Sequence, residues 1–263
     1  MLPDPIFGLF YMYGLMIAVG ILAAFLVLFT YSKKLNIPTK LADFVFYDAI
    51  AAIVIGFGAA ALFQATYNYI ENPAAGFRLG SGITFIGGLI GGAIAFLAVY
   101  FIFRKRLGIR LSQIVSVIPC CIFVAHGFGR VGCFFAGCCH GKPTDFFLGI
   151  KFPGMTQAVH PTQLYEAAFL FAMFAVCSVL LFKLKFKHNL SLYFASYGIF
   201  RFLIEYLRGD SRGELVGPIS PSQFWSLLMI VISVGVFFIE CKFVKLPEKE
   251  PEAPKEAEIS EKE

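Results

Sequence analysis

Long apolar runs alternate with short polar segments along most of this 263-residue chain. Each run has close to the ~20 residues that an α-helix needs to cross the hydrocarbon core of a bilayer. The pattern therefore predicts an all-α polytopic membrane protein. Seven membrane-spanning helices are expected, at residues 9–30, 43–66, 82–103, 111–129, 163–182, 189–207 and 222–241.

The end of the chain departs from this pattern. Residues 246–263 contain seven Glu, three Lys and three Pro, without apolar periodicity. Such a composition cannot bury enough apolar surface to fold. We expect residues 1–245 to form one seven-span membrane domain and residues 246–263 to form a disordered, charged cytoplasmic tail.

Composition supports the assignment of the chain as a membrane protein, and the distribution of charge predicts its orientation. Hydrophobic residues make up 58% of the chain and charged residues 15%, against about 25% charged residues in soluble domains. The net charge of +5 is not spread evenly, which argues against nucleic-acid binding. Fifteen of the 22 Lys and Arg residues fall on one side of the predicted spans and seven on the other. By the positive-inside rule, the N-terminus lies outside and the C-terminus lies in the cytoplasm.

The segment 126–141, with sequence HGFGRVGCFFAGCCHG, carries the densest chemistry in the chain. Arg130 stands at the end of a membrane-length apolar run, where an arginine is costly unless it binds a partner. The five glycines of the segment allow the backbone to approach a partner closely. We therefore expect Arg130 to lie at the functional site, on the outer side of the membrane.

A second group of charged residues occupies the sixth predicted span. Arg201, Glu205 and Arg208 are spaced i, i+4, i+7 and share one helix face, and Tyr197 precedes them by one turn. The group could anchor the helix at the membrane interface, with Glu205 only neutralising an arginine. We favour a phosphate clamp, because guanidinium groups pair with phosphate oxygens.

The segment His160-Pro-Thr-Gln-Leu-Tyr-Glu166 opens the fifth predicted span. Its proline and its acidic residue are ordinary features of a helix N-terminus. That interpretation leaves His160, Gln163 and Tyr165 unexplained, so a role in the site is favoured.

Glycines and cysteines supply two further candidate features. Gly87 and Gly88 lie in a glycine-rich stretch that favours close helix packing and would also admit a lipid headgroup.

Cys133, Cys138 and Cys139 do not have the paired spacing of common zinc sites, and a disulfide among them is equally compatible with the sequence. We expect no metal ligand and no cofactor, although a membrane thiol-redox or metal protein built on these cysteines and His140 stays an alternative.

Taken with their order along the chain, these motifs resemble bacterial prolipoprotein diacylglyceryl transferases. The resemblance covers about residues 8–241 and rests on four elements. These are Tyr13-Gly-Leu, Gly129-Arg-Val-Gly132-x-Phe with Gly141, the His160–Glu166 segment, and Tyr197-x3-Arg201-Phe-x2-Glu205-x2-Arg208.

The resemblance implies an activity and its partners. The family transfers a diacylglyceryl group from phosphatidylglycerol to the lipobox cysteine of a prolipoprotein, which forms a thioether and releases glycerol phosphate. The expected partners are phosphatidylglycerol, prolipoprotein signal peptides with a lipobox cysteine, and membrane lipids. The expected location is the bacterial inner membrane, with the site facing the outer leaflet.

Residue roles follow from the same resemblance. Arg130 and Arg201 are expected to hold the phosphate and to stabilise the departing anion. Glu205 and Arg208 are expected to orient them. The remaining expected substrate-binding residues are Tyr13, Gly87, Gly88, Gly129, Gly132, Gly141, His160, Gln163, Tyr165, Glu166 and Tyr197.

The chain departs from the family pattern at three positions. Ile86 replaces a histidine that is a candidate proton acceptor for the substrate thiol, and Cys133 and Cys138 replace an asparagine and an acidic residue. His126, His140 or His160 could substitute, and His126, one helical turn before Arg130, is the preferred base. These departures also allow a divergent paralogue that binds phosphatidylglycerol but uses another acceptor.

Overall fold

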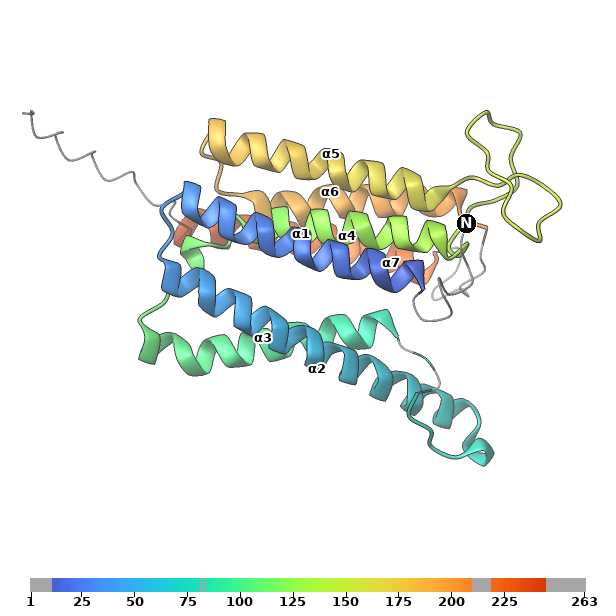
Figure 1. The fold of residues 1–263 in the computed structure, drawn as a ribbon, viewed down its shortest axis with the longest axis horizontal. Helices are drawn as coiled ribbons and strands as arrows, with labels where there is room; N and C mark the ends of the chain where they lie inside the picture. Colours follow the sequence, from blue (N-terminus) through green and yellow to red (C-terminus); the bar gives the residue numbers. More distant parts are fainter. Residues whose placement is uncertain (1–10, 81, 83, 210–218, 245–263) are drawn as a thin grey trace, which may run out of the picture. The chain divides into compact units, whose positions relative to one another are not determined.

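The computed structural model describes residues 11–80, 82, 84–209 and 219–244 (Figure 1). The predicted tail at 246–263 and the first two residues of the first predicted span lie outside these ranges. The described residues form seven α-helices and three short 3-10 turns, with isolated β-bridges but no strands. The helices are α1 (Met12–Lys34), α2 (Thr39–Glu71), α3 (Phe85–Leu107), α4 (Ile118–Phe135), α5 (Thr162–Lys183), α6 (Asn189–Ile204) and α7 (Pro221–Phe243), and the 3-10 turns are η1 (Pro73–Ala75), η2 (Leu111–Gln113) and η3 (Glu205–Leu207).

Six of the helices are long and apolar enough to cross a membrane. The sixth helix, α6, has 16 residues and continues into η3, so that together they occupy the predicted span 189–207. The all-helical fold is confirmed for the described residues, and the chain is a multi-pass membrane protein.

The fourth helix lies further along the chain than the sequence predicts. The expected span was 111–129, whereas α4 runs from Ile118 to Phe135. Pro119 occupies the first turn, where the missing N–H costs nothing, and therefore favours a helix start at this point. Arg130 consequently lies within the helix, not at the end of an apolar run.

The chain divides into two compact units, residues 38–111 and the remainder. In the larger unit, α1, α4, α5, α6 and α7 lie side by side as a bundle (Figure 1). Helix α4 contacts α1, α5 and α6, and α7 packs on α6. Glycines permit the closest approaches: a Cβ on Gly20 of α1 would lie 2.9 Å from the Ala125 carbonyl oxygen of α4, and one on Gly198 of α6 would lie 2.9 Å from the Ser226 carbonyl oxygen of α7.

One end of this bundle is fixed by a buried glutamate. The Glu240 carboxylate of α7 accepts hydrogen bonds from the backbone N–H groups of Leu190 and Ser191, at 3.1 and 3.2 Å. These groups lie in the first turn of α6, whose N–H groups have no partner within the helix. Glu240 therefore supplies the negative charge that the N-terminus of α6 favours.

The smaller unit consists mainly of α2 and α3. Gly87 and Gly88 both face α2: a Cβ on Gly87 would lie 2.6 Å from the Cβ of Phe63, and one on Gly88 would lie 3.2 Å from the Cβ of Ala60. Gly87 and Gly88 thus allow α3 to pack closely on α2, as the sequence predicts.

Candidate active site

Polar residues of the larger unit gather where five helix ends meet. Helices α1, α5 and α7 begin there, and α4 and α6 end there, because helices that follow one another along the chain in this unit run in opposite directions (Figure 1). The loop between α4 and α5 projects from the same end. This topology brings together sequence segments that are up to about 200 residues apart, from Tyr13 to Ser220.

Glu166 is the centre of the first polar cluster. Its side chain is 1% exposed, and its Oε1 lies 3.0 Å from Nε of Arg130 on α4. The same oxygen accepts a hydrogen bond of 2.7 Å from the Tyr197 hydroxyl on α6. A buried carboxylate of this kind fixes the position of its cation, since either charge alone would be costly at that depth.

Glu205 is the centre of the second cluster. Its Oε2 lies 2.8 Å from Nη2 of Arg201 and 3.8 Å from Nε of Arg208. The Ser220 hydroxyl, at the N-terminus of α7, donates to Glu205 Oε1 at 3.0 Å. The same serine caps α7 by accepting from the Gln223 N–H, so the cluster is joined to the start of the last helix.

Arg201 retains donor capacity. Its Nη2 donates to the Ser222 hydroxyl at 2.9 Å, whereas its buried Nη1 has no hydrogen-bond partner among the described residues. Buried donors are nearly always satisfied in folded proteins. Nη1 is therefore a candidate donor to a ligand.

Together, the two clusters carry an excess of positive charge. Within these clusters, three guanidinium groups lie close to two carboxylates, so that Arg130, Arg201, Arg208, Glu166 and Glu205 together carry one net positive charge. An anionic ligand such as a phosphodiester would neutralise this charge.

His126 lies next to the first cluster. Its Nε2 is 3.7 Å from Glu166 Oε1, and its ring meets the Tyr197 ring edge to face at 5.0 Å between centroids. Residue 126 precedes Arg130 by four positions on α4, so both side chains occupy one helix face, as the sequence predicts.

Backbone hydrogen bonds join three segments that lie next to the charged clusters. The Gly141 N–H donates to the His160 carbonyl at 2.7 Å, and the Lys142 N–H donates to the Leu207 carbonyl at 2.8 Å. A Cβ on Gly141 would lie 2.5 Å from the Leu207 oxygen and 2.7 Å from the His160 Cβ. Gly141 is thus required by the close approach of these segments.

The first residues of α5 hold the loop that follows α4. The Thr162 hydroxyl donates to the Cys139 carbonyl at 2.7 Å, and the Gln163 amide donates to the Cys138 carbonyl. Gln163 therefore positions backbone in the site. His160 Nδ1 lies 3.4 Å from the Tyr165 hydroxyl, so those two predicted residues are also neighbours.

Tyr13 and two glycines complete the predicted set. The Tyr13 ring packs against Gly132, where a Cβ would lie 3.2 Å from a ring carbon. Apart from its chain neighbours and its own helix backbone, no atom of the described residues lies within 4 Å of the position that a Cβ on Gly129 would occupy. Open space beside a glycine one residue before Arg130 is suited to a ligand that approaches the backbone.

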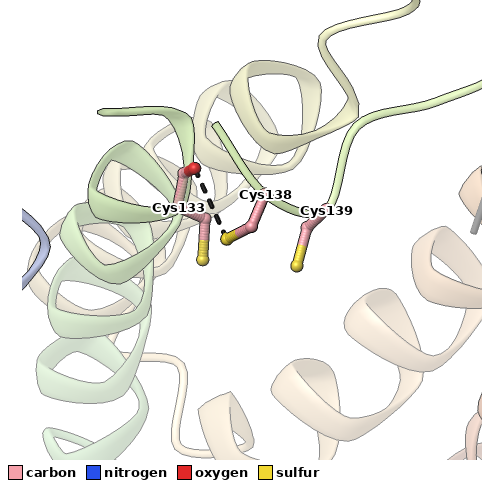
Figure 2. Close-up of side chains that lie close together, drawn as sticks. All are labelled: Cys133, Cys138 and Cys139. Atoms are coloured by element: carbon pink, nitrogen blue, oxygen red, sulfur yellow. Dashed lines mark hydrogen bonds between the residues drawn. The ribbon is translucent and has the colours of Figure 1, made fainter. Parts of the chain in front are cut away.

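Three thiols lie at the edge of this site. The sulfur atoms of Cys133, Cys138 and Cys139 are within 4.8 Å of one another (Figure 2). Hydrogen bonds from Cys133 and Cys138, and the Arg208 guanidinium beside them, lower the pKa of the Cys139 thiol, although burial opposes this shift. The seven cysteines of the chain form no disulfide in the structure.

The structure brings most of the predicted site residues together and adds others. Gly87 and Gly88 belong to the smaller unit, where they contact α2. Arg208 is not on the helix that carries Arg201, because α6 ends at Ile204 and the backbone is extended at residue 208. Sequence reasoning missed Ser220 and Ser222; a serine before a proline signals only a helix start.

Comparisons with known proteins give a consistent result. A family model described as prolipoprotein diacylglyceryl transferase matches residues 6–239. A Clostridium tetani (strain Massachusetts / E88) protein named phosphatidylglycerol--prolipoprotein diacylglyceryl transferase is 40% identical over 247 residues, covering 89% of this chain and 95% of that protein. A Clostridium perfringens (strain 13 / Type A) protein with the same name followed by the number 2 is 34% identical, over 89% of this chain and 93% of that protein. A Staphylococcus aureus (strain MSSA476) protein with the same name is also 34% identical, over 85% of this chain and 82% of that protein.

Proposed function

The chain belongs to the prolipoprotein diacylglyceryl transferase family, and from that premise we propose that it lipidates prolipoproteins at the outer leaflet of the bacterial inner membrane. The reaction transfers a diacylglyceryl group from phosphatidylglycerol to the lipobox cysteine thiol. All seven helices cross the membrane in this proposal, with the N-terminus outside, since the basic residues concentrate on the opposite side.

The observation that carries the proposal is the pair of buried carboxylates that hold three arginines at one end of the bundle. Arg130 and Arg201 bind the phosphate of phosphatidylglycerol, and Arg201 Nη1 offers a buried donor for it. As the substrate sulfur forms a bond to the glyceryl carbon, the bond from that carbon to the phosphate oxygen breaks. The leaving glycerol phosphate gains negative charge, which fixed guanidinium groups stabilise without reorganisation.

The other residues position these groups or the substrates. Glu166 with Tyr197 orients Arg130, and Glu205 orients Arg201 and Arg208. The open space beside Gly129 admits the lipid headgroup, while Gln163 and Gly141 hold the surrounding loops.

His126 is proposed as the proton acceptor for the substrate thiol. A thiol with a pKa of about 8.5 is mostly protonated at neutral pH, and Ile86 has no group that accepts a proton. Replacement of His126 by Gln should lower the rate of lipidation about 100-fold, the usual contribution of a general base. Full activity in His126→Gln, measured by peptide lipidation in vitro, would remove this role.

Complementation in a bacterial strain depleted of its own transferase tests the proposed function. The wild-type chain should restore growth and lipoprotein maturation, and an Arg130→Lys variant should not, because a lysine cannot reproduce the guanidinium fork. Arg104→Lys, at the opposite end of α3 from its glycines, is the matched control. If the wild-type chain inserts normally into the membrane but does not restore growth, the chain is a paralogue that transfers the lipid group to another acceptor.

A further inference from the structure

The thiols of Cys133, Cys138 and Cys139 have no part in the function proposed above. Cys133 lies in the last turns of α4, three residues after Arg130, and the other two lie in the loop that follows. Figure 2 shows that the three side chains turn their sulfur atoms toward a common region. The sequence alone did not predict a metal site, because the spacing of these cysteines is unusual and only the fold brings them together.

The separation of the sulfur atoms suits a thiophilic cation. All three lie within 4.8 Å of one another. Sulfur ligands bound to Zn²⁺ at about 2.3 Å in tetrahedral geometry lie about 3.8 Å apart, so small rotations of the side chains would close the site. A disulfide would instead require two of the sulfur atoms to approach to about 2.05 Å.

The backbone of this loop is held in place before any ligand binds. Thr162 and Gln163, both 1% exposed, donate to the carbonyl oxygens of Cys139 and Cys138. Cys139 has a φ of 64°, a conformation that is uncommon for residues other than glycine. Such a conformation persists only where surrounding contacts enforce it, and it often marks a functional site.

Charge and exposure favour a cation with one open coordination position. Three thiolates and a divalent cation carry one net negative charge, and the Arg208 guanidinium lies next to Cys139. Cys138 is exposed, whereas Cys133 is 9% exposed, so the cluster opens on one side. Three protein ligands and an open fourth position are typical of zinc sites that bind a substrate.

We propose that Cys133, Cys138 and Cys139 bind a thiophilic divalent cation such as Zn²⁺, whose fourth position takes the thiol of the substrate cysteine. This proposal rests on the proposed transferase function, because the acceptor substrate of that reaction is a thiol.

The step balances without an oxidant. The substrate thiol loses its proton when its sulfur binds the cation, since a coordinated thiol is deprotonated. The proton passes through water to His126. The coordinated sulfur then attacks the glyceryl carbon, the bond from that carbon to the phosphate oxygen breaks, and glycerol phosphate leaves with the electron pair. The thioether product is a weaker ligand than a thiolate and departs.

Metal binding by the purified full chain tests this proposal independently of activity. The chain in detergent, freed of metal and titrated with Co²⁺, should bind one equivalent and show the absorption of a thiolate-bound cobalt centre. Loss of a residue that only supports a metal ligand lowers metal affinity by up to about 100-fold. Cys139→Ser removes a ligand itself and should therefore weaken cobalt binding by more than about 100-fold. Cys241→Ser, which changes an exposed cysteine on α7, should leave binding unchanged. Equal binding by Cys139→Ser and the wild type would mean adventitious metal and overturn the site.

A peptide with a lipobox cysteine tests the fourth position. It should increase the thiolate absorption of the cobalt protein, and the same peptide with serine in place of cysteine should not. Chelation should lower the rate of peptide lipidation at least ten-fold, and Zn²⁺ should restore it. Full lipidation by metal-free protein would overturn this inference and leave the proposed function intact. Binding of metal and peptide without any release of glycerol phosphate would overturn the proposed function instead.

Discussion

Among single residues, Glu166 near the start of α5 and Glu205 directly after α6 have corresponding roles. Each is a buried carboxylate that binds an arginine and accepts a hydrogen bond from a hydroxyl group, Tyr197 for the first and Ser220 for the second. Buried arginines need such partners, and the partner fixes where the guanidinium points. The carboxylates therefore determine the geometry in which the arginines meet a phosphate.

Replacement of Glu166 by Gln tests this role. The substitution keeps the shape of the side chain but leaves Arg130 without a counter-ion, and breaking a buried ion pair costs about 3–5 kcal/mol. We expect a lower melting temperature in detergent and a loss of lipidation activity of at least ten-fold. The matched control is Glu71→Gln on α2, where an exposed carboxylate accepts a hydrogen bond from the Tyr67 hydroxyl. Equal effects of the two substitutions on melting temperature and activity would contradict the assigned role.

At the scale of helices and loops, the sequence predicts what is local and misses what depends on neighbours. The i, i+4 spacing of Arg201 and Glu205 predicts their ion pair, which the structure contains at 2.8 Å. The same reasoning placed Arg208 on the helix and was wrong, because α6 ends in a 3-10 turn. The contact of Glu166 with Tyr197 joins residues 31 positions apart, so no local pattern reveals it.

Two glycines that look equivalent in the sequence should respond differently to alanine. At Gly141 a Cβ would lie 2.5 Å from the Leu207 oxygen, so Gly141→Ala should separate the joined loop segments and lower thermal stability. At Gly129 a Cβ meets no atom within 4 Å, so Gly129→Ala should fold normally. If the lipid headgroup approaches there, the variant should raise the KM for phosphatidylglycerol several-fold. Normal stability of Gly141→Ala in thermal unfolding would refute the packing argument.

At the scale of the whole molecule, the alternating direction of the helices places the polar residues of the larger unit at one end of its bundle. Helix α7 runs from Pro221, close to Ser220 and Glu205, to Phe243 at the opposite end. The positive-inside rule assigns the first end to the outer side. The distribution of basic residues thus predicts the orientation and places the charged segments on one side of the membrane, and the fold shows that these segments share one end of the larger unit's bundle.

Cysteines at the two ends provide a test of this orientation. Cys138 and Cys241 are both exposed, the first beside the site and the second near the end of α7. A membrane-impermeant maleimide added to intact spheroplasts should label Cys138 and spare Cys241 until the membrane is permeabilised. Cys138→Ser and Cys241→Ser identify the labelled residues by mass spectrometry. Labelling of Cys241 alone in intact spheroplasts would reverse the orientation.

A reconstituted assay measures the proposed transfer of diacylglyceryl from phosphatidylglycerol to a cysteine thiol. The full chain in phosphatidylglycerol liposomes is incubated with a lipobox peptide, and peptide mass and released glycerol phosphate are followed together. We expect a thioether-linked diacylglyceryl adduct and one glycerol phosphate for each modified peptide, and neither product with Arg130→Lys. A peptide that stays unmodified, under conditions where a relative of the family modifies it, would overturn the proposed function.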